Sequence, residues 1–292
     1  MELGVLIQFT DWVRGQCRYP QKMLGRDIKH LSPSDNTSRR ILVFAAHPDD
    51  EVIGIGGLLA GHVRRGDHVF LVFTTNGRGK GWFTRVKNQA QYVDQRYREA
   101  FNAADVLGIP RHRMCFLGFP DGTLYRYMPY LLLDVNYVFR EVRPHRVYVH
   151  ALEGGHVDHD ATNVVVRAAS REIDFTHVWE WAEYSRTVDV GDPSINFPTG
   201  PNTEPVLKIP TRWDIKKPLL NAYSSQPPAQ RASHHFEVVR KANFGTLKQE
   251  IDEIYGGSGP NAKIASQLSR IIDPLNGVSL FSFVGAANRI MP

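Results

Sequence analysis

Residues 41–51 are Ile-Leu-Val-Phe-Ala-Ala-His-Pro-Asp-Asp-Glu, an apolar run followed directly by an imidazole and three carboxyl groups. The apolar part predicts a buried β-strand, and the glycine-containing residues 52–59 predict a loop that turns into a helix. Three carboxylates this close repel one another unless a positive charge lies among them. A histidine and carboxylates at the end of a buried strand therefore indicate a divalent metal site with an acid/base group beside it.

The order strand, loop, helix repeats from this stretch through residue 170. Further strands are predicted at 68–74, 113–117 and 146–150, and helices at 53–65, 88–107, 130–142 and 161–170. Strands that are apolar at nearly every position are typical of parallel sheets buried on both faces. The sequence therefore predicts an α/β fold with a mostly parallel sheet, and ligands bind such sheets at the carboxyl ends of the strands.

The domain organisation follows from composition along the chain. Residues 1–38 are predicted to be an N-terminal extension that begins with a short helix and ends in a linker rich in turn-forming residues. Residues 39–292 are expected to form one domain, with a core at 39–170 and a C-terminal completion at 171–292. In that completion, strands are predicted at 178–184, 206–210 and 280–284, helices at 213–223 and 246–255, and a long loop at 186–205.

Composition and charge exclude several classes of protein. The 292 residues are 42% hydrophobic and 22% charged, which fits a globular domain. The formal net charge is +5 with scattered basic residues, so we expect a solvated surface of mixed charge and no nucleic-acid partner. No apolar run approaches the ~20 residues of a transmembrane helix. Cys17 and Cys115 form no metal or disulfide pattern, which is typical of a reducing compartment and predicts a cytoplasmic protein. The oligomeric state stays open, an oligomer included.

Two clusters of polar side chains follow predicted strands, His47 to Asp50 and His156 to His159. If the two strands are close in one parallel sheet, the clusters meet at one edge. Two histidines and one carboxylate leave positions open for water and substrate on a metal, and His47, Asp50 and His159 are the predicted ligands.

The remaining members of the two clusters, Asp49, His156 and Asp158, are then left around the metal. A carboxylate beside a metal can act as a base, and a second histidine can donate to a developing oxyanion. Asp158 can orient a neighbouring imidazole. Glu51 has two interpretations: it orients His47, or it is a favourable negative charge at a helix start.

Simpler interpretations compete with the metal site. A histidine at a strand end is more often a satisfied polar residue, and H-x-x-H alone is a weak signal. Two dense clusters at strand ends favour the metal.

Residues 54–57, Gly-Ile-Gly-Gly, also resemble a dinucleotide-binding turn. The spacing of that motif fails, because position 59 is Leu, and no acidic residue ends the second strand. These glycines are instead expected to allow close packing of the helix on the sheet.

Several motifs together resemble those of the LmbE-like, or PIG-L, de-N-acetylases. They are A-H-P-D-D-E at 46–51, T-N-G at 75–77, R-x-x-E-x-x-x-A-x-x-x-L-G at 96–108, L-G-F-P-D-G at 117–122, H-x-D-H at 156–159 and Y-S-S-Q at 223–226. The resemblance covers mainly residues 40–170. It implies a Rossmann-like three-layer fold, with helices on both faces of a mostly parallel sheet.

The resemblance also implies roles for single residues. The positions that match the family's metal ligands are His47, Asp50 and His159, and the implied metal is Zn²⁺, with another divalent metal as the alternative. Asp49 matches the general base, and His156 matches the group that stabilises the tetrahedral intermediate.

Arg96 and Asp121 match positions that contact sugar hydroxyls in relatives. Their simpler interpretations are an exposed helix arginine and a turn residue. One position departs from the family, because Arg78 stands where relatives often carry a glutamate. A basic residue there puts the usual sugar contacts in doubt and can accommodate an anionic substituent, although a solvated basic loop is the simpler interpretation.

The activity implied by the resemblance is zinc-dependent hydrolysis of the N-acetyl group of an N-acetylglucosamine-type amino sugar or conjugate. The products are acetate and a free amine, so the expected partner is a small-molecule amino sugar. The alternatives are a metal-dependent hydrolase of another amide bond and a sugar-binding module with a structural metal. A structural zinc normally has four protein ligands, and three candidates favour catalysis. The loops at 75–87, 120–130 and 186–205 are expected to determine which sugar is bound.

Overall fold

The computed structural model describes residues 38–79, 89–184, 196–226, 234–256 and 260–272. The predicted N-terminal helix, the strand at 280–284 and parts of the predicted loops at 75–87 and 186–205 lie outside these ranges.

A seven-stranded sheet forms the centre of the described fold, in the order β3-β2-β1-β4-β5-β7-β6. The strands are β1 (Arg40–Ala45), β2 (His68–Thr75), β3 (Met114–Phe119), β4 (Arg146–His150), β5 (Val178–Ala182), β6 (Val206–Pro210) and β7 (Phe236–Lys241). The first five in this numbering pair in parallel, whereas β7 is antiparallel to both β5 and β6. The predicted mostly parallel sheet is therefore confirmed.

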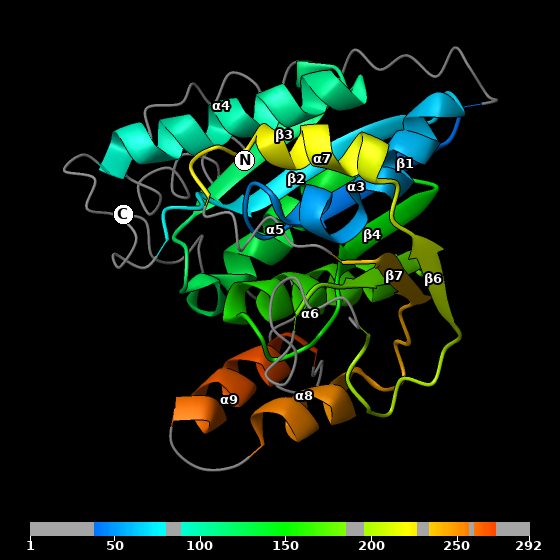
Figure 1. Cartoon of the computed structure of the whole chain (residues 1–292). Coiled ribbons are helices and arrows are strands. Elements are labelled where there is room, and N and C mark those ends of the chain that lie inside the picture. The colour runs from blue at the N-terminus through cyan, green and yellow to red at the C-terminus, as the bar shows by residue number, and fades with distance from the viewer. Residues whose placement is uncertain (1–37, 80–88, 185–195, 227–233, 257–259, 273–292) are drawn as a thin grey trace.

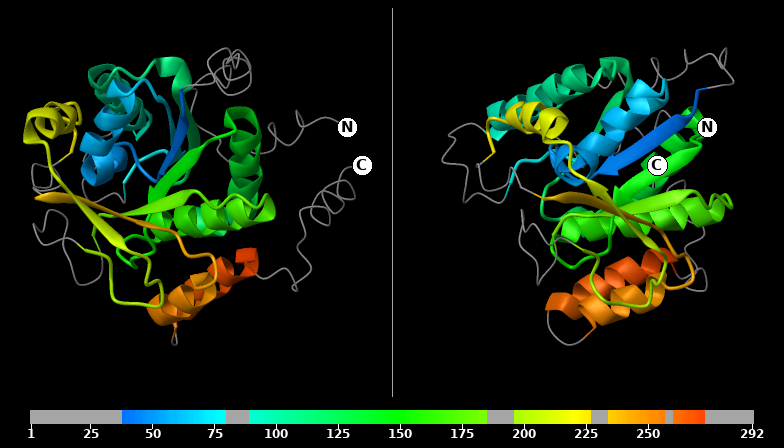
Figure 2. Two further views of the ribbon diagram at one scale, coloured as in Figure 1. Left: turned by 90° about the vertical axis from the view of Figure 1, so that its right-hand side faces the viewer. Right: turned by 45° about the vertical axis from the view of Figure 1, so that its right-hand side comes forward.

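Helices cover both faces of this sheet. They are α3 (Asp50–Arg64), α4 (Gln89–Leu107), α5 (Met128–Val142), α6 (Val157–Glu172), α7 (Trp213–Asn221), α8 (Leu247–Tyr255) and α9 (Pro260–Ile272). Figures 1 and 2 show α3, α4 and α7 on one face and α5 and α6 on the other. The helices α8 and α9 pack beside α6. This arrangement confirms the three-layer α/β fold class.

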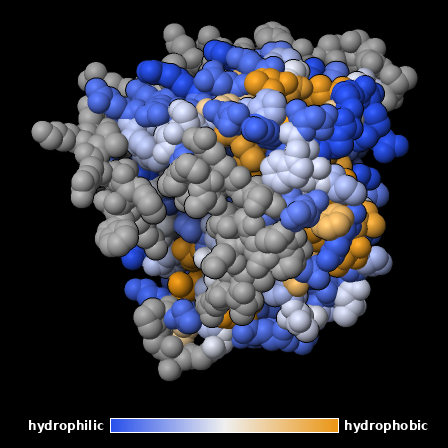
Figure 3. All heavy atoms as spheres, viewed as in Figure 1, coloured by the Kyte–Doolittle hydropathy of each residue, from blue (hydrophilic) through white to orange (hydrophobic). Residues whose placement is uncertain are grey.

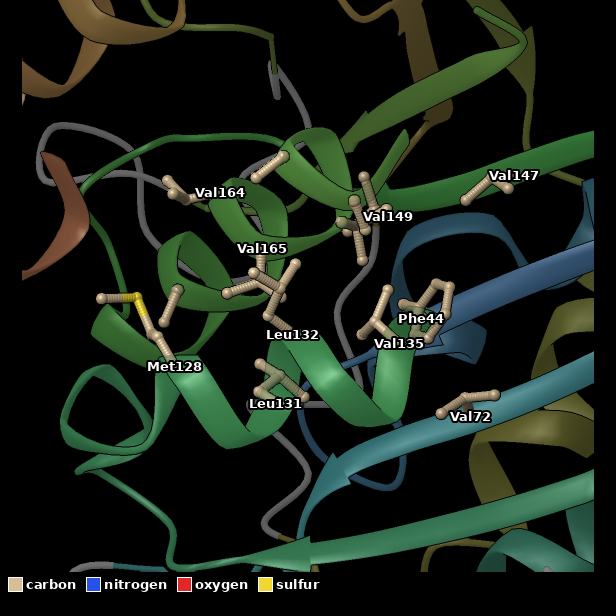
Figure 4. Close-up of a cluster of buried hydrophobic side chains, with 14 of the residues drawn as sticks. Phe44, Val72, Met128, Leu131, Leu132, Val135, Val147, Val149, Val164 and Val165 are labelled. Carbon is tan, nitrogen blue, oxygen red and sulfur yellow. The ribbon is translucent and has the colours of Figure 1, made fainter. Parts of the chain in front are cut away.

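The core is divided by the sheet into two clusters of buried apolar side chains. Successive residues of β1 alternate between them, so Leu42 and Phe44 face α5 and α6 while Val43 faces α3 and α4. This alternation follows from the two-residue period of a strand, and it requires β1 to be apolar on both sides. Figure 4 shows the first cluster, in which Leu132 and Val135 of α5 lie with Phe44.

Glycines let α3 approach the sheet closely, as the sequence predicted. A Cβ atom added to Gly54 would lie 2.3 Å from the Trp181 ring of β5, which is closer than any real contact. At Gly57, the same atom would lie 3.1 Å from the Glu237 carboxylate. That carboxylate accepts the backbone N–H groups of Gly57 and Leu58 at 2.7 Å each.

The starts of two helices at the site, α6 and α3, differ from the sequence prediction, and a further strand and helix were not predicted. The helix α6 begins at Val157 rather than residue 161, so His159 lies in its first turn. Its N-cap is His156, whose ring nitrogen accepts the N–H of Asp158. Asp158 and Asp160 in the first turn place negative charge at the helix N-terminus, where it stabilises the helix. Likewise α3 begins at Asp50 instead of after a loop. The strand β7 and the helix α9 were not predicted.

The surface agrees with the predicted solvated exterior. On the face seen in Figure 3, hydrophilic residues predominate and hydrophobic areas between them are small. Among the described residues, the structure contains no helix that is both long and apolar enough to span a membrane.

Candidate metal and catalytic site

The site lies at the carboxyl ends of β1 and β4, which are adjacent and parallel. The turn after β1 carries His47 and Asp49, and Asp50 begins α3. After β4, His156 is the N-cap of α6 and His159 lies in its first turn. Because parallel neighbours end at the same edge, residues more than 100 positions apart come together.

Three donor atoms at the centre of the site are almost equidistant. The Asp50 Oδ2 atom lies 3.2 Å from His47 Nδ1 and 3.3 Å from His159 Nε2, and the two ring nitrogens are 3.3 Å apart. A four-coordinate zinc ion with bonds of about 2.0–2.1 Å holds its ligand atoms about 3.3–3.4 Å from one another. The donor set and its spacing therefore fit a divalent metal ion with three protein ligands.

The charge of the three predicted ligands also suits a metal. Burial raises the pKa of Asp50, but the imidazoles of His159 and His47 outweigh burial and hold it well below its ordinary value. Burial and the neighbouring His150 lower the pKa of His159 to about 4, so its ring is neutral. Burial lowers the pKa of His47, but the carboxylates of Asp121 and Asp50 outweigh this and raise it well above its ordinary value. The site thus attracts positive charge, as a proton or as a cation.

The outer nitrogen of His47 faces two carboxylates. Its Nε2 atom lies 3.3 Å from Asp158 Oδ2 and 3.4 Å from Asp121 Oδ1. Asp158 is itself fixed, because its two oxygens accept the N–H groups of Gly122 and Leu124 at 2.5 and 3.0 Å. A proton on Nε2 leaves the Nδ1 lone pair directed at the three-atom cluster. This carboxylate–histidine arrangement is the usual support of a metal-bound imidazole, and it gives Asp158 the orienting geometry that the sequence predicted.

His156 is placed as a hydrogen-bond donor toward the site. Its Nδ1 atom accepts the N–H of Asp158 at 3.2 Å, so the proton of the neutral ring is on Nε2. Burial and the charge on His47 lower the pKa of His156 to about 3, which keeps the ring neutral. The His156 ring lies against that of His47, with centroids 4.6 Å apart.

Asp49 is held by an arginine. The Arg96 guanidinium, 3% exposed on α4, donates to both oxygens of Asp49 at 3.0 and 3.3 Å and to the carbonyl of Pro48. Burial raises the pKa of Asp49 to about 6, with Arg96 opposing the rise. In this structure Arg96 contacts the predicted base, and its contact with a sugar hydroxyl remains a prediction.

The predicted specificity residues are only partly described. Asp121 lies at the site, where its second oxygen accepts the N–H of Gly79 at 2.8 Å, and its sugar contact also remains a prediction. Arg78 is exposed and donates to Gln89 at 3.0 Å. The aromatic residues Tyr125 and Tyr127 pack partly buried against the core cluster of α5 and α6.

Sequence reasoning missed His150, the last residue of β4. It is fully buried, and its Nε2 atom lies 3.1 Å from Asp50 Oδ2 and accepts the N–H of Ala46 at 3.0 Å. Its ring stacks on that of His159 with centroids 3.8 Å apart. The available signal was a histidine ending an apolar strand at the same edge as the two clusters. Asp50, His150 and His159 also form a group whose donor atoms lie within 4.8 Å of one another.

One interpretation of the sequence was that Glu51 orients His47. No described hydrogen bond or ion pair joins these two residues. The Glu51 carboxylate instead accepts hydrogen bonds from the Asp49 N–H and the Tyr223 hydroxyl. Tyr223 begins the Y-S-S-Q segment.

Comparison with known proteins identifies the family of this chain. The model of the family PIG-L, GlcNAc-PI de-N-acetylase, matches residues 42–170. A probable N-acetyl-alpha-D-glucosaminyl L-malate deacetylase 2 of Bacillus cereus is 30% identical over 222 residues, covering 72% of this chain and 93% of that protein. A 1D-myo-inositol 2-acetamido-2-deoxy-alpha-D-glucopyranoside deacetylase 1 of Catenulispora acidiphila is 32% identical over 167 residues, 48% of this chain and 51% of that protein. The chain thus spans about half the length of that second relative.

Solved structures share the fold. A deacetylase of teicoplanin biosynthesis, in complex with teicoplanin, superposes with a TM-score of 0.56 at 17% identity, covering 69% of this chain and 97% of that one. An A40926 pseudoaglycone deacetylase gives the same TM-score at 18% identity, covering 70% and 96%. The extent of the Bacillus cereus match, together with the family match over residues 42–170 and their two polar clusters, shows that this chain belongs to the PIG-L family of de-N-acetylases.

Proposed function

We propose that this de-N-acetylase uses a zinc ion to hydrolyse the N-acetyl group of an N-acetylglucosamine-type amino sugar or conjugate, releasing acetate and a free amine. The relatives named above are deacetylases of N-acetylglucosaminyl malate and of an inositol-linked acetamido sugar, which supports this substrate class. The observation that carries the proposal is the cluster of three donor atoms beside a buried, arginine-held carboxylate.

The metal is assigned to His47, Asp50 and His159. Two imidazoles and one carboxylate suit zinc, and three ligands leave a position for water and substrate. When bound there, zinc would polarise the acetamide carbonyl and increase the acidity of water. His150 is left as a neighbour of Asp50, since its Nε2 lone pair already accepts the Ala46 N–H.

Asp49 is assigned as the general base. Its carboxyl is close enough to His47 and Asp50 for their charges to shift its pKa, and a pKa of about 6 leaves it mostly ionised at neutral pH. It takes a proton from the attacking water while the water oxygen bonds to the acetyl carbon. It then gives that proton to the nitrogen as the C–N bond breaks. Acetic acid and the amine leave, and the Asp49 carboxylate is restored. The acid then releases the second water proton to the amine or to solvent and becomes acetate.

His156 is assigned as the hydrogen-bond donor to the carbonyl oxygen of the substrate's acetyl group. Its Nε2–H is the proton left over after Nδ1 accepts the Asp158 N–H, so a neutral ring can still donate. That donation strengthens as negative charge develops on the oxygen. Asp158 supports both histidines, through its backbone to His156 and its carboxylate to His47.

Location and domain structure are proposed from the sequence. We place the protein in the cytoplasm, because its cysteines form no disulfide pattern. We also propose that residues 39–292 form one domain preceded by an extension at 1–38.

The test is acetate release from N-acetylated amino sugars by the purified protein, first as prepared, then after chelation, then after zinc is restored. We expect activity that is lost with the chelator and recovered with zinc. Parallel reactions with N-acetylated amino acids address the other amide class. No acetate from any amino sugar, together with release from an amide without a sugar, would contradict the proposed substrate.

A further inference from the structure

The backbone of Asp49 is in an unusual conformation. Its φ of +123° and ψ of −27° lie in a region that residues other than glycine rarely occupy. Such a conformation persists only when surrounding contacts hold it, and it is common at functional sites. The contacts that hold Asp49 therefore also determine where its carboxylate is directed.

Glu51 holds the backbone of Asp49 through a hydrogen bond. Its Oε2 atom accepts the Asp49 N–H at 3.1 Å, and its Oε1 atom accepts the Tyr223 hydroxyl at 2.5 Å. Glu51 is fully buried and Tyr223 is 1% exposed, so water does not replace either bond. A buried chain of hydrogen bonds thus runs from the Tyr223 hydroxyl through the Glu51 carboxylate to the Asp49 amide. Tyr223 and Glu51 are 172 positions apart in the sequence.

Tyr223 is in turn fixed by α4, the helix that carries Arg96. Glu99 of α4 accepts hydrogen bonds from the Ser224 hydroxyl at 3.0 Å and from the Ser225 N–H and hydroxyl at 2.8 and 2.5 Å. Arg96 and Glu99 are three residues apart and therefore lie on neighbouring positions of one helix face. One helix face holds the Asp49 carboxylate directly and the Asp49 backbone through the Y-S-S-Q segment.

We propose that Glu51 and Tyr223 are positioning residues for Asp49, which act by holding its backbone in the left-handed conformation so that its carboxylate faces the metal-binding atoms. The inference rests on the proposed role of Asp49 as base. It assigns a function to the Y-S-S-Q segment and to Glu51, neither of which contacts the three-atom cluster through a described hydrogen bond or ion pair. Without the Tyr223 bond, the Glu51 carboxyl loses one of its hydrogen-bond partners and can turn away from the Asp49 amide.

The test compares Tyr223→Phe, Glu51→Leu and Glu51→Gln with the wild type. The control is Tyr148→Phe, which also removes a buried tyrosine hydroxyl with hydrogen-bond partners. That hydroxyl lies by His62 and Arg146, and Arg146 starts β4, away from its carboxyl end. Two readouts are needed: the steady-state kinetics of acetate release, and crystal structures of the metal-free proteins that give the φ angle of Asp49.

We expect Tyr223→Phe and Glu51→Leu to lower kcat by about 10- to 100-fold, with KM within about twofold, since misplacement of a catalytic group by ~1 Å has effects of this size. Their metal content should stay that of the wild type. Glu51→Gln keeps a carbonyl acceptor for the Asp49 N–H and a partner for Tyr223, so it should recover most of the loss. In the Tyr223→Phe crystal, Asp49 should leave the positive-φ region. Tyr148→Phe should change neither readout.

An unchanged Asp49 φ angle in both Tyr223→Phe and Glu51→Leu would overturn the inference, whatever the kinetics. An equal fall in kcat for Tyr148→Phe would do so as well, because the loss would then follow general destabilisation. If the wild type releases no acetate from any amino sugar, the proposed function fails, and the φ angles alone decide the positioning role.

Discussion

The Nδ1 atom of His47 lies 3.3 Å from the Nε2 atom of His159, although 112 positions separate the two residues. The parallel pairing of β1 with β4 brings them together, with Ile41 opposite Arg146 and Phe44 opposite Val149. Asp50 Oδ2 completes the cluster from the first turn of α3. The division of roles among these side chains leads to the predictions below.

Replacing His156 with alanine should remove an oxyanion donor without removing the metal. We expect kcat to fall on the order of 100-fold or more, which is the size of effect seen for one oxyanion-hole donor. Metal content by elemental analysis should equal that of the wild type. His112→Ala is the control, because His112 is an exposed histidine just before β3. Near-normal turnover by His156→Ala would refute the assignment.

Activity should fall at acidic pH as Asp49 becomes protonated. Burial raises the pKa of Asp49 to about 6, and a bound cation would move it downward. Below that pKa, kcat/KM should lose about tenfold per pH unit, because only the carboxylate accepts a proton. Arg96 opposes the rise, so Arg96→Met should shift the acidic limb of the pH profile to higher pH. A limb that stays in place or moves to lower pH in this variant would contradict the pairing.

Glu51 should make the metal-free protein less stable as pH rises. Burial raises the pKa of Glu51 to about 8 in the folded chain, from an ordinary value near 4.5. Between these values the unfolded chain binds fewer protons at this site than the folded chain, so stability falls with rising pH. Glu51→Gln removes this titration, and its free energy of unfolding relative to the wild type should increase by up to ~1.4 kcal/mol per pH unit between pH 5 and 8. Urea unfolding at several pH values measures the difference, and a difference independent of pH would show that Glu51 is ionised in the fold.

A buried network of ion pairs that joins α6 to β5 and α8 should contribute strongly to the stability of the fold. The fully buried Arg167 donates to Glu180 of β5 at 3.2 Å and to Glu250 of α8 at 2.8 Å. Arg167→Ala leaves both carboxylates short of a partner and should lower the free energy of unfolding by about 3–5 kcal/mol. The control is Arg111→Ala, which breaks an exposed ion pair with Asp105 and should have no measurable effect. Equal effects of the two variants would contradict this account.

The sheet and the clusters at its edge follow from local patterns in the sequence. Apolar runs such as residues 41–45 specify strands buried on both faces, and glycines at 54 and 57 anticipate the close approach of α3. The start of α6 was predicted too late, because His156 caps the helix with a ring nitrogen in place of a commoner capping side chain. The strand β7 was missed, although it includes Val238 and Val239, because three of its six residues, Glu237, Arg240 and Lys241, are charged and its apolar residues do not alternate with them.

Three contacts of the site between distant residues were not predicted. Arg96 has the sequence context of a helix-surface arginine, and only the packing of α4 over the turn after β1 directs it at Asp49, 47 positions earlier. Similarly, His150 is at a strand end, but its contact with Asp50 depends on the register of β1 with β4. Glu51 lacks a role in the sequence because its partner Tyr223 lies in another third of the chain.

The central claim is that the adjacent residues Asp49 and Asp50 have different functions, one moving protons and the other holding the metal. It is tested most directly by measuring metal content and acetate release in Asp49→Asn and Asp50→Asn, two changes of equal size. Asp49→Asn should keep the full metal content and lose turnover by ~100-fold or more, as expected for a lost general base. Asp50→Asn should lose the metal and the activity together. Full metal content in Asp50→Asn with metal loss in Asp49→Asn would contradict the account.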